Sequence, residues 1–137
     1  MAKDFYHNNV KEALEKDGWR ITHDPYHVSV EEVGYEIDFA AEPLLAAEKD
    51  ENKIAIEVKS FIGPSTINEF HRAVGQFNDY SVALEIQDPE RVLFLAILND
   101  IWLRFFQKQV IQKSLERIKA KILVYNPNSS IVVEWIK

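Results

Sequence analysis

The sequence predicts an α/β fold in which a mixed β-sheet is flanked by helices. Residues 34–42 and 53–61 alternate apolar with polar or small side chains, which is the pattern of strands. Residues 91–98 are almost continuously apolar, as is typical of a strand buried on both faces. Two long segments, 66–86 and 101–120, carry apolar side chains at helical spacing. Strands interleaved with helices therefore indicate one sheet with helices packed on it.

The composition is that of a soluble globular protein and excludes several classes. With 137 residues the chain can form one hydrophobic core but hardly two, so we expect a single domain, residues 1–137. No cysteine is present, which excludes disulfides and thiolate metal sites. No apolar run approaches the roughly 20 residues of a membrane-spanning helix, and residues 1–9 lack the apolar core of a signal peptide, so we expect a cytoplasmic protein. The net charge of -6 argues against unspecific coating of nucleic acid but is compatible with a nuclease that has an acidic metal site.

The N-terminal part is predicted to form a helix followed by a short strand. Residues 3–16 have apolar positions close to helical spacing, and an Asp-Gly pair follows as a stop signal. Trp19–His23 alternates like a strand and ends at the turn signal Asp24-Pro25. The pattern of residues 26–32 fits either an extended edge or a loop.

The two central strands are expected to pair. Within residues 34–42, Asp38 shares a face with polar or small groups, whereas the large apolar side chains face the other way. An apolar link and a turn over residues 43–52 lead to the strand at 53–61. This short connection favours an antiparallel pair, which brings Asp38 toward the polar side chains of the second strand if the register permits.

A long helix and four further elements are predicted after these strands. A Gly-Pro pair ends the preceding strand, and Ser65 or Thr66 can cap a helix that runs to about Ile86. On this helix Gln76 and Tyr80 lie four residues apart and share one side. The elements that complete the chain are a central strand (91–98), a helix (101–120) and two closing strands (121–125 and 131–136). The predicted order is helix, three strands, helix, strand, helix and two strands.

Asp38, Glu57 and Lys59 are the candidate catalytic residues. Glu57 and Lys59 lie two apart on a strand, so a carboxylate and an ammonium point to the same side. With Asp38 on the neighbouring strand, two carboxylates offer oxygen ligands to Mg²⁺ or Mn²⁺, and the lysine can stabilise developing negative charge. This set is typical of metal-assisted phosphodiester hydrolysis. Spacing alone leaves an alternative, an ordinary solvated strand face, because charged residues make up 28% of the chain.

Histidines and aromatic residues carry weaker functional alternatives. His23 and His27 cannot form a helical pair of metal ligands because Asp24-Pro25 lies between them, and the remaining histidines, His7 and His71, have no companion. We therefore interpret the histidines as loop or surface groups. Three aromatic residues at helical spacing favour burial in the core over a base-stacking surface: Trp102, Phe105 and Phe106.

The acidic and basic residues resemble the motif of the PD-(D/E)xK nuclease superfamily. Its restriction-endonuclease-like core is a helix, three strands, a helix and a further strand, with an Asp on the second strand and Glu-x-Lys on the third. Asp38, Glu57 and Lys59 stand at these positions, although an isoleucine replaces the proline that precedes the Asp. Glu12 on the first helix resembles the extra acidic residue of some members, and Gln76 resembles a helix glutamine found in several branches.

A narrower resemblance, over nearly the whole chain, is to the XisH family of fdxN element excision controlling factors. The stretches that carry it occur in the same order: DGWRITHDP (17–25), IDFAAE (37–42), AAEK (46–49), KIAIEVKSF (53–61), GQF (75–77) and RVLFLAI (91–97). This resemblance implies a small cytoplasmic protein needed for programmed excision of a DNA element. It implies DNA, an XisI-type controlling factor and a site-specific recombinase as partners.

Two hypotheses of function follow from the residues and the resemblance. In the first, the protein is a nuclease-like DNA-processing protein that depends on Mg²⁺ or Mn²⁺: Asp38 and Glu57 ligate the metal, and Glu12 adds a ligand through water. Lys59 then orients the attacking water, and Gln76 fixes the nucleophile or a phosphate oxygen. In the second, the protein is a catalytically silent regulator that binds a controlling factor or a recombinase. Formation of a homodimer through the last strand is compatible with either hypothesis.

Overall fold

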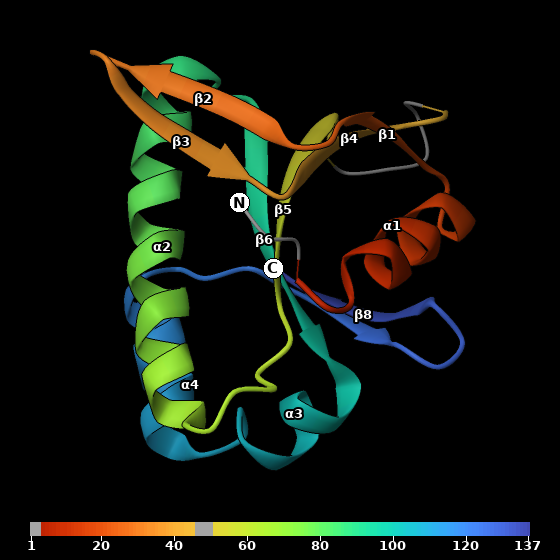
Figure 1. Cartoon of the computed structure of the whole chain (residues 1–137), viewed down its shortest axis with the longest axis vertical. Helices are drawn as coiled ribbons and strands as arrows, with labels where there is room; N and C mark the ends of the chain where they lie inside the picture. Colours follow the sequence, from red (N-terminus) through yellow and green to blue (C-terminus); the bar gives the residue numbers. More distant parts are fainter. Residues whose placement is uncertain (1–3, 46–50) are drawn as a thin grey trace.

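The predicted α/β class is confirmed by the computed structural model, which describes residues 4–45 and 51–137 (Figure 1). Six strands form one mixed sheet in the order β1-β4-β5-β6-β7-β8, and β2 and β3 form a separate two-stranded sheet. The strands are β1 (Trp19–His23), β2 (Tyr26–Val30), β3 (Val33–Ile37), β4 (Phe39–Pro43), β5 (Lys53–Lys59), β6 (Arg91–Leu98), β7 (Ile122–Asn126) and β8 (Ile131–Ile136). The helices are α1 (His7–Lys16), α2 (Thr66–Gln87), α3 (Asn99–Arg104) and α4 (Gln109–Arg117).

The middle of the large sheet is its apolar core. β6 pairs in parallel with β5 on one side and with β7 on the other, so the continuous apolar run lies at the centre, as predicted. Parallel pairs need a crossover, which α2 supplies between β5 and β6. Fully buried side chains from adjacent strands, such as Ile56, Phe94 and Leu123, fill this region. In Figure 1, α2 and α4 lie on one side of the sheet and α1 lies on the other.

The predicted antiparallel pairing of the two central strands is confirmed. β4 pairs with β5 so that Phe39 lies opposite Ile56 and Ala41 lies opposite Ile54. In this register the residue before Phe39 lies next to the residue after Ile56. The backbone therefore brings Asp38 beside Glu57. The two strands are flanked by β1, which pairs with β4, and by β6, which pairs with β5.

The prediction of one strand over residues 34–42 was wrong. The chain bends at Asp38, which separates β3 from β4. β3 instead pairs with β2 in an antiparallel hairpin, so residues 26–30 take the extended alternative. The hairpin turn contains Glu31 and Glu32, both with left-handed φ, 49° and 69°. At the bend, where the chain passes from the two-stranded to the six-stranded sheet, the backbone N–H of Asp38 donates to the Glu57 side chain.

The prediction of one continuous helix over residues 101–120 was also wrong. The chain forms two shorter helices, α3 and α4, with a break over residues 105–108. Phe106 is completely buried at the break and packs against Phe61 and Phe70. The side chain of Gln112 donates a hydrogen bond to the Phe106 carbonyl, and that of Gln107 donates to the Trp102 carbonyl. Aromatic burial thus interrupts the helix, and amides satisfy backbone groups near the break. Trp102 and Phe105 also pack against the core, which confirms the core interpretation.

Smaller differences concern the ends of elements. α1 begins at His7 rather than at residue 3, which lies outside the described residues. β5 ends at Lys59, two residues early, and Phe61 has a left-handed φ of 55°. In the predicted link and turn over 43–52, residues 46–50 lie outside the described part. Ser65 caps α2 by accepting the Asn68 N–H, 3.3 Å away. Within the described residues, no helix is long and apolar enough to cross a membrane.

Candidate active site

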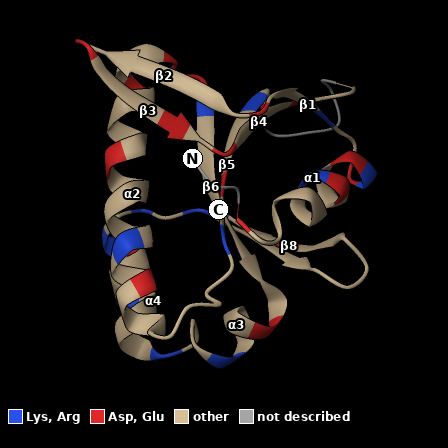
Figure 2. Ribbon diagram, viewed as in Figure 1, with Lys and Arg blue, Asp and Glu red and all other residues tan. Residues whose placement is uncertain are grey.

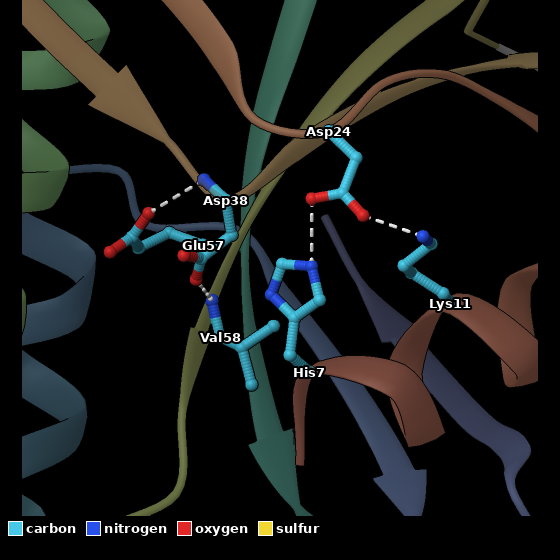
Figure 3. Close-up of polar contacts among 6 residues, drawn as sticks. All are labelled: His7, Lys11, Asp24, Asp38, Glu57 and Val58. Carbon is cyan, nitrogen blue, oxygen red and sulfur yellow. Dashed lines mark hydrogen bonds and ion pairs between the residues drawn. The ribbon is translucent and has the colours of Figure 1, made fainter. Parts of the chain in front are cut away.

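Asp38 and Glu57 lie side by side where β4 begins and β5 approaches its end (Figure 3). The Asp38 N–H donates a hydrogen bond to Glu57 Oε1 over 3.2 Å. In return, the Val58 N–H donates to Asp38 Oδ2 over 2.7 Å. Each carboxylate is therefore oriented by a backbone N–H of the other strand, so both side chains are held in defined positions without a bound ligand.

Lys59 completes the predicted trio on the same face of β5. Its Nζ lies 3.3 Å from Glu57 Oε2, as expected for side chains two residues apart on a strand. Glu57 is only 7% exposed, which contradicts the alternative of a solvated strand face. A buried carboxylate with a partly buried ammonium beside it costs folding free energy, because desolvation opposes both charges, and groups with such a cost are concentrated at functional sites.

The electrostatics of the two carboxyls are those of a crowded anionic site. Burial, and then the charge of Asp38, raise the pKa of Glu57 to about 7, although Lys59 and the Asp38 N–H oppose this. Burial also raises the pKa of Asp38, against the opposing effects of the Val58 N–H, His7 and Lys59. Both shifts mean that negative charge on the pair is destabilised. A cation between the carboxylates would relieve this destabilisation.

Helix α2 contributes Gln76 and Tyr80 from the neighbouring layer. Tyr80 is buried, and burial followed by the charges of Glu57 and Asp38 raises its pKa to about 12, so its hydroxyl keeps its proton. Gln76 lies one turn before Tyr80, on the same side of the helix, as predicted. Its Oε1 is buried and has no hydrogen-bond partner among the described residues. Gln76 thus offers an unused acceptor from the helix that faces the two carboxyls.

The structure does not bring Glu12 to this group. The Glu12 side chain is 60% exposed and its Oε1 lies 3.6 Å from Lys16 Nζ, one turn further along α1. The part of α1 that approaches the site is its first turn, which carries His7. Close to it, Asp4 accepts hydrogen bonds from the Ser60 N–H and hydroxyl, 3.2 and 3.0 Å away, and its charge adds to the rise in the pKa of Asp38.

The interpretation of His7 as a surface group was wrong. His7 is 3% exposed, its Nε2 lies 3.0 Å from Asp24 Oδ1, and its ring packs edge-on against Phe39. One sequence signal was available for this burial: His7 lies three and seven residues before Val10 and Leu14, so it belongs to the apolar stripe of α1.

The residues present suit a metal ion that takes few protein ligands. Among the described residues, no group of three or more His, Asp or Glu side chains is arranged to hold a metal. The site instead offers two carboxylates, Asp38 and Glu57, whose pKa values are raised by burial and, for Glu57, also by the charge of Asp38. Mg²⁺ is commonly bound by one or two carboxylates and keeps several waters. The donor set therefore fits Mg²⁺ or Mn²⁺ better than a metal that needs a complete protein cage.

Comparison with known proteins identifies the family. The family model described as XisH protein matches residues 1–133. The chain belongs to the XisH family. An XisH family protein from Nostoc punctiforme has a solved structure that is 42% identical, with a TM-score of 0.88 and coverage of 98% of this chain and 100% of that one. The crystal structure of an fdxN element excision controlling factor protein from Anabaena variabilis is 40% identical, with a TM-score of 0.88 and the same coverage.

A search of curated proteins finds no match. The resemblance to the XisH family is thus confirmed over nearly the whole chain, and the fold is shared with members of that family. The resemblance to the PD-(D/E)xK superfamily stays a prediction, as do the roles of the site residues.

Proposed function

We propose that the protein takes part in the excision of a DNA element and acts there as a metal-dependent, nuclease-like DNA-processing protein. The name of the Anabaena variabilis relative, an element excision controlling factor, supports the first part. The second part rests on one observation, the buried pair Asp38 and Glu57 with Lys59 beside it. This pair costs folding free energy when it is charged, and a divalent cation offsets that cost.

In this proposal each residue of the site has a separate role in phosphodiester hydrolysis. Asp38 and Glu57 supply carboxylate oxygens that hold Mg²⁺ or Mn²⁺, as in the restriction-endonuclease-like core that the sequence resembles. When bound, such a metal lowers the pKa of a coordinated water and neutralises phosphate charge. Lys59 orients the attacking water and offsets negative charge that develops on the phosphate. Gln76 accepts a hydrogen bond from the nucleophilic water through its unpartnered Oε1, or donates one to a phosphate oxygen through its amide N–H. Glu12 has no part in this proposal because of its exposed position.

A cluster of cations supports DNA as the partner despite the net charge of -6. Residues 108–121 contain five Lys or Arg side chains and a single acid, Glu116. None of the five forms an ion pair with a described residue, whereas cations elsewhere, such as Lys11 and Arg20, pair with acids. Part of this segment is the blue stretch between α4 and β7 in Figure 2. We call residues 108–121 the basic segment; its five cations are Lys108, Lys113, Arg117, Lys119 and Lys121. Unpaired cations on one segment are suited to contact phosphates.

Cleavage of DNA in the presence of Mg²⁺ or Mn²⁺ tests the proposal. Asp38→Asn and Lys59→Ala are expected to fold and to lose metal-dependent cleavage of plasmid and linear DNA. Glu90→Gln, which removes an exposed acid from the turn before β6, is the matched control and keeps full activity. Wild-type rates in the Asp38 and Lys59 variants, with cleavage present, would reject the assignment of these residues.

One observation favours the second candidate function, a regulator without catalysis. Three of the carboxylate oxygens already have partners within the chain: Glu57 Oε1 and Oε2, and Asp38 Oδ2. The regulator would bind an XisI-type controlling factor, a recombinase or a second copy through β8, the edge of the large sheet, where Ile131 and Val133 are 49% and 50% exposed. Calorimetric titration separates the candidates: heat of Mn²⁺ binding that disappears in Asp38→Asn supports the nuclease-like function, and no binding at millimolar Mn²⁺ supports the regulator.

A further inference from the structure

His7 is held in one orientation by an acid on the far side from the candidate active site. Its Nε2 lies 3.0 Å from Asp24 Oδ1, and Lys11 Nζ forms an ion pair with the other oxygen of Asp24 (Figure 3). Burial opposes ionisation of Asp24, but its hydrogen bonds to Lys11 and His7 outweigh burial and hold its pKa below the ordinary value. Asp24 is therefore a carboxylate, which accepts the proton that His7 carries on Nε2.

The other ring nitrogen of His7 is left on the side of Asp38. Its Nδ1 is buried and has no hydrogen-bond partner among the described residues. Figure 3 shows the ring between Asp24 and Asp38. The ring also packs against Phe39, the residue next to Asp38. A buried polar atom without a partner destabilises the folded state, so a ligand that donated a hydrogen bond to Nδ1 would be stabilised here.

We propose that His7 is a positioning residue of the Asp38–Glu57 site, whose Nδ1 accepts a hydrogen bond from a water in the hydration shell of a divalent cation bound at Asp38. This inference rests on the proposed metal-dependent function. His7 acts through water rather than as a ligand, because no three His, Asp or Glu side chains among the described residues can hold a metal together. Groups that orient metal-bound ligands from outside the coordination sphere commonly change metal affinity when they are removed.

The two ring nitrogens can be removed separately. A glutamine places its amide where Nε2 lies, so His7→Gln keeps a partner for Asp24 and removes Nδ1. An asparagine places its amide where Nδ1 lies, so His7→Asn keeps an acceptor on the Asp38 side and removes the bond to Asp24. His71→Gln, at an exposed histidine of α2, is the matched control. Each variant is characterised by its melting temperature and by calorimetric titration with Mn²⁺ at pH 8, where an ordinary histidine is neutral.

The expected result is a weakening of Mn²⁺ binding by about tenfold to a hundredfold in His7→Gln, with little change in melting temperature. His7→Asn is expected to melt at a lower temperature yet to bind Mn²⁺ more tightly than His7→Gln does. A purely structural histidine gives the opposite pattern, in which His7→Gln binds Mn²⁺ with wild-type affinity. That pattern overturns the inference but leaves the proposed function intact.

Failure of the proposed function gives a different result, in which the wild-type protein itself does not bind Mn²⁺. That result rejects both the metal-dependent function and the role of His7. If His7→Gln does not fold, the wild-type protein decides by nitrogen NMR of its histidines. Addition of Mg²⁺ is then expected to shift the Nδ1 resonance of His7 and to leave that of His71 in place. An unshifted His7 resonance in protein that binds Mg²⁺ rejects the inference.

Discussion

Replacement of Glu57 by glutamine is expected to stabilise the metal-free protein at pH 8. The pKa of Glu57 rises from an ordinary 4.5 to about 7 on folding, because burial and the nearby Asp38 disfavour its charge. Each pKa unit is worth about 1.36 kcal/mol, so ionisation of Glu57 costs the folded state about 3 kcal/mol. Glutamine has nearly the same shape, keeps an acceptor for the Asp38 N–H and carries no charge.

The sign of the pH dependence follows from the raised pKa. Below pH 4.5 Glu57 is protonated in both the folded and the unfolded state, so its ionisation costs no stability there. Between pH 4.5 and about 7 the unfolded state releases the proton first, so the contribution of Glu57 to stability falls as pH rises. Above pH 7 the whole cost is present. The difference in free energy of unfolding between Glu57→Gln and wild type should therefore grow from near zero at pH 4.5 to about 3 kcal/mol at pH 8.

Urea denaturation in the presence of a chelator measures this difference. Both proteins are unfolded at several values between pH 4.5 and 8, and Glu90→Gln serves as the control, in which the difference stays near zero. Taking the difference between two proteins removes the titration of groups that do not interact with Glu57 from the comparison. A difference in free energy of unfolding that stays constant across this range would refute the reasoning that burial and Asp38 destabilise the charged form of Glu57. A variant less stable than wild type at pH 8 would refute it as well.

Three further predictions concern metal, DNA and core. Affinity for Mn²⁺ in calorimetry should rise between pH 6 and pH 8, because the cation must displace the proton of Glu57, whose pKa is about 7; pH-independent affinity would contradict this. In the basic segment, Lys113→Ala with Arg117→Ala should weaken DNA binding and reduce the salt slope of log K by about 2, measured by fluorescence anisotropy against the control Arg72→Ala. Phe106→Ala should lower the free energy of unfolding by about 3–5 kcal/mol, because it empties the aromatic cluster at the helix break; a loss below 1 kcal/mol in urea denaturation would refute this.

The central pair of strands was predictable because its signals are local. Alternation over residues 53–61 places Glu57 and Lys59 on one face, and the short connection favours antiparallel pairing, which sets Asp38 beside them. Both inferences use spacings of a few residues. The family resemblance added order along the whole chain, and the comparisons confirm it.

The features that sequence reasoning missed all depend on distant partners. The bend at Asp38 interrupts a regular alternation, and the backbone N–H at the bend donates to Glu57, 19 residues away. The apolar residues keep helical spacing across the break between α3 and α4, so the pattern does not reveal the break. Its position coincides with the burial of Phe106 against Phe61 and Phe70. His7 carries a polar ring into the core because Asp24 lies there to receive it. No local pattern indicates which distant group will satisfy a polar atom.

The bend at Asp38 also joins two units that differ in their resistance to local opening. A two-stranded hairpin is marginal by itself, so β2 and β3 depend on contacts such as the Tyr35–Tyr80 ring pair and the 2.7 Å hydrogen bond from the Tyr26 hydroxyl to Asp88. Such a unit is expected to exchange its amide hydrogens faster than the six-stranded sheet does. Because Asp38 directly follows β3, we expect opening of the hairpin to displace its carboxylate from Glu57. Metal binding at the site should then slow amide exchange in β2 and β3, although these strands contribute no residue to the site.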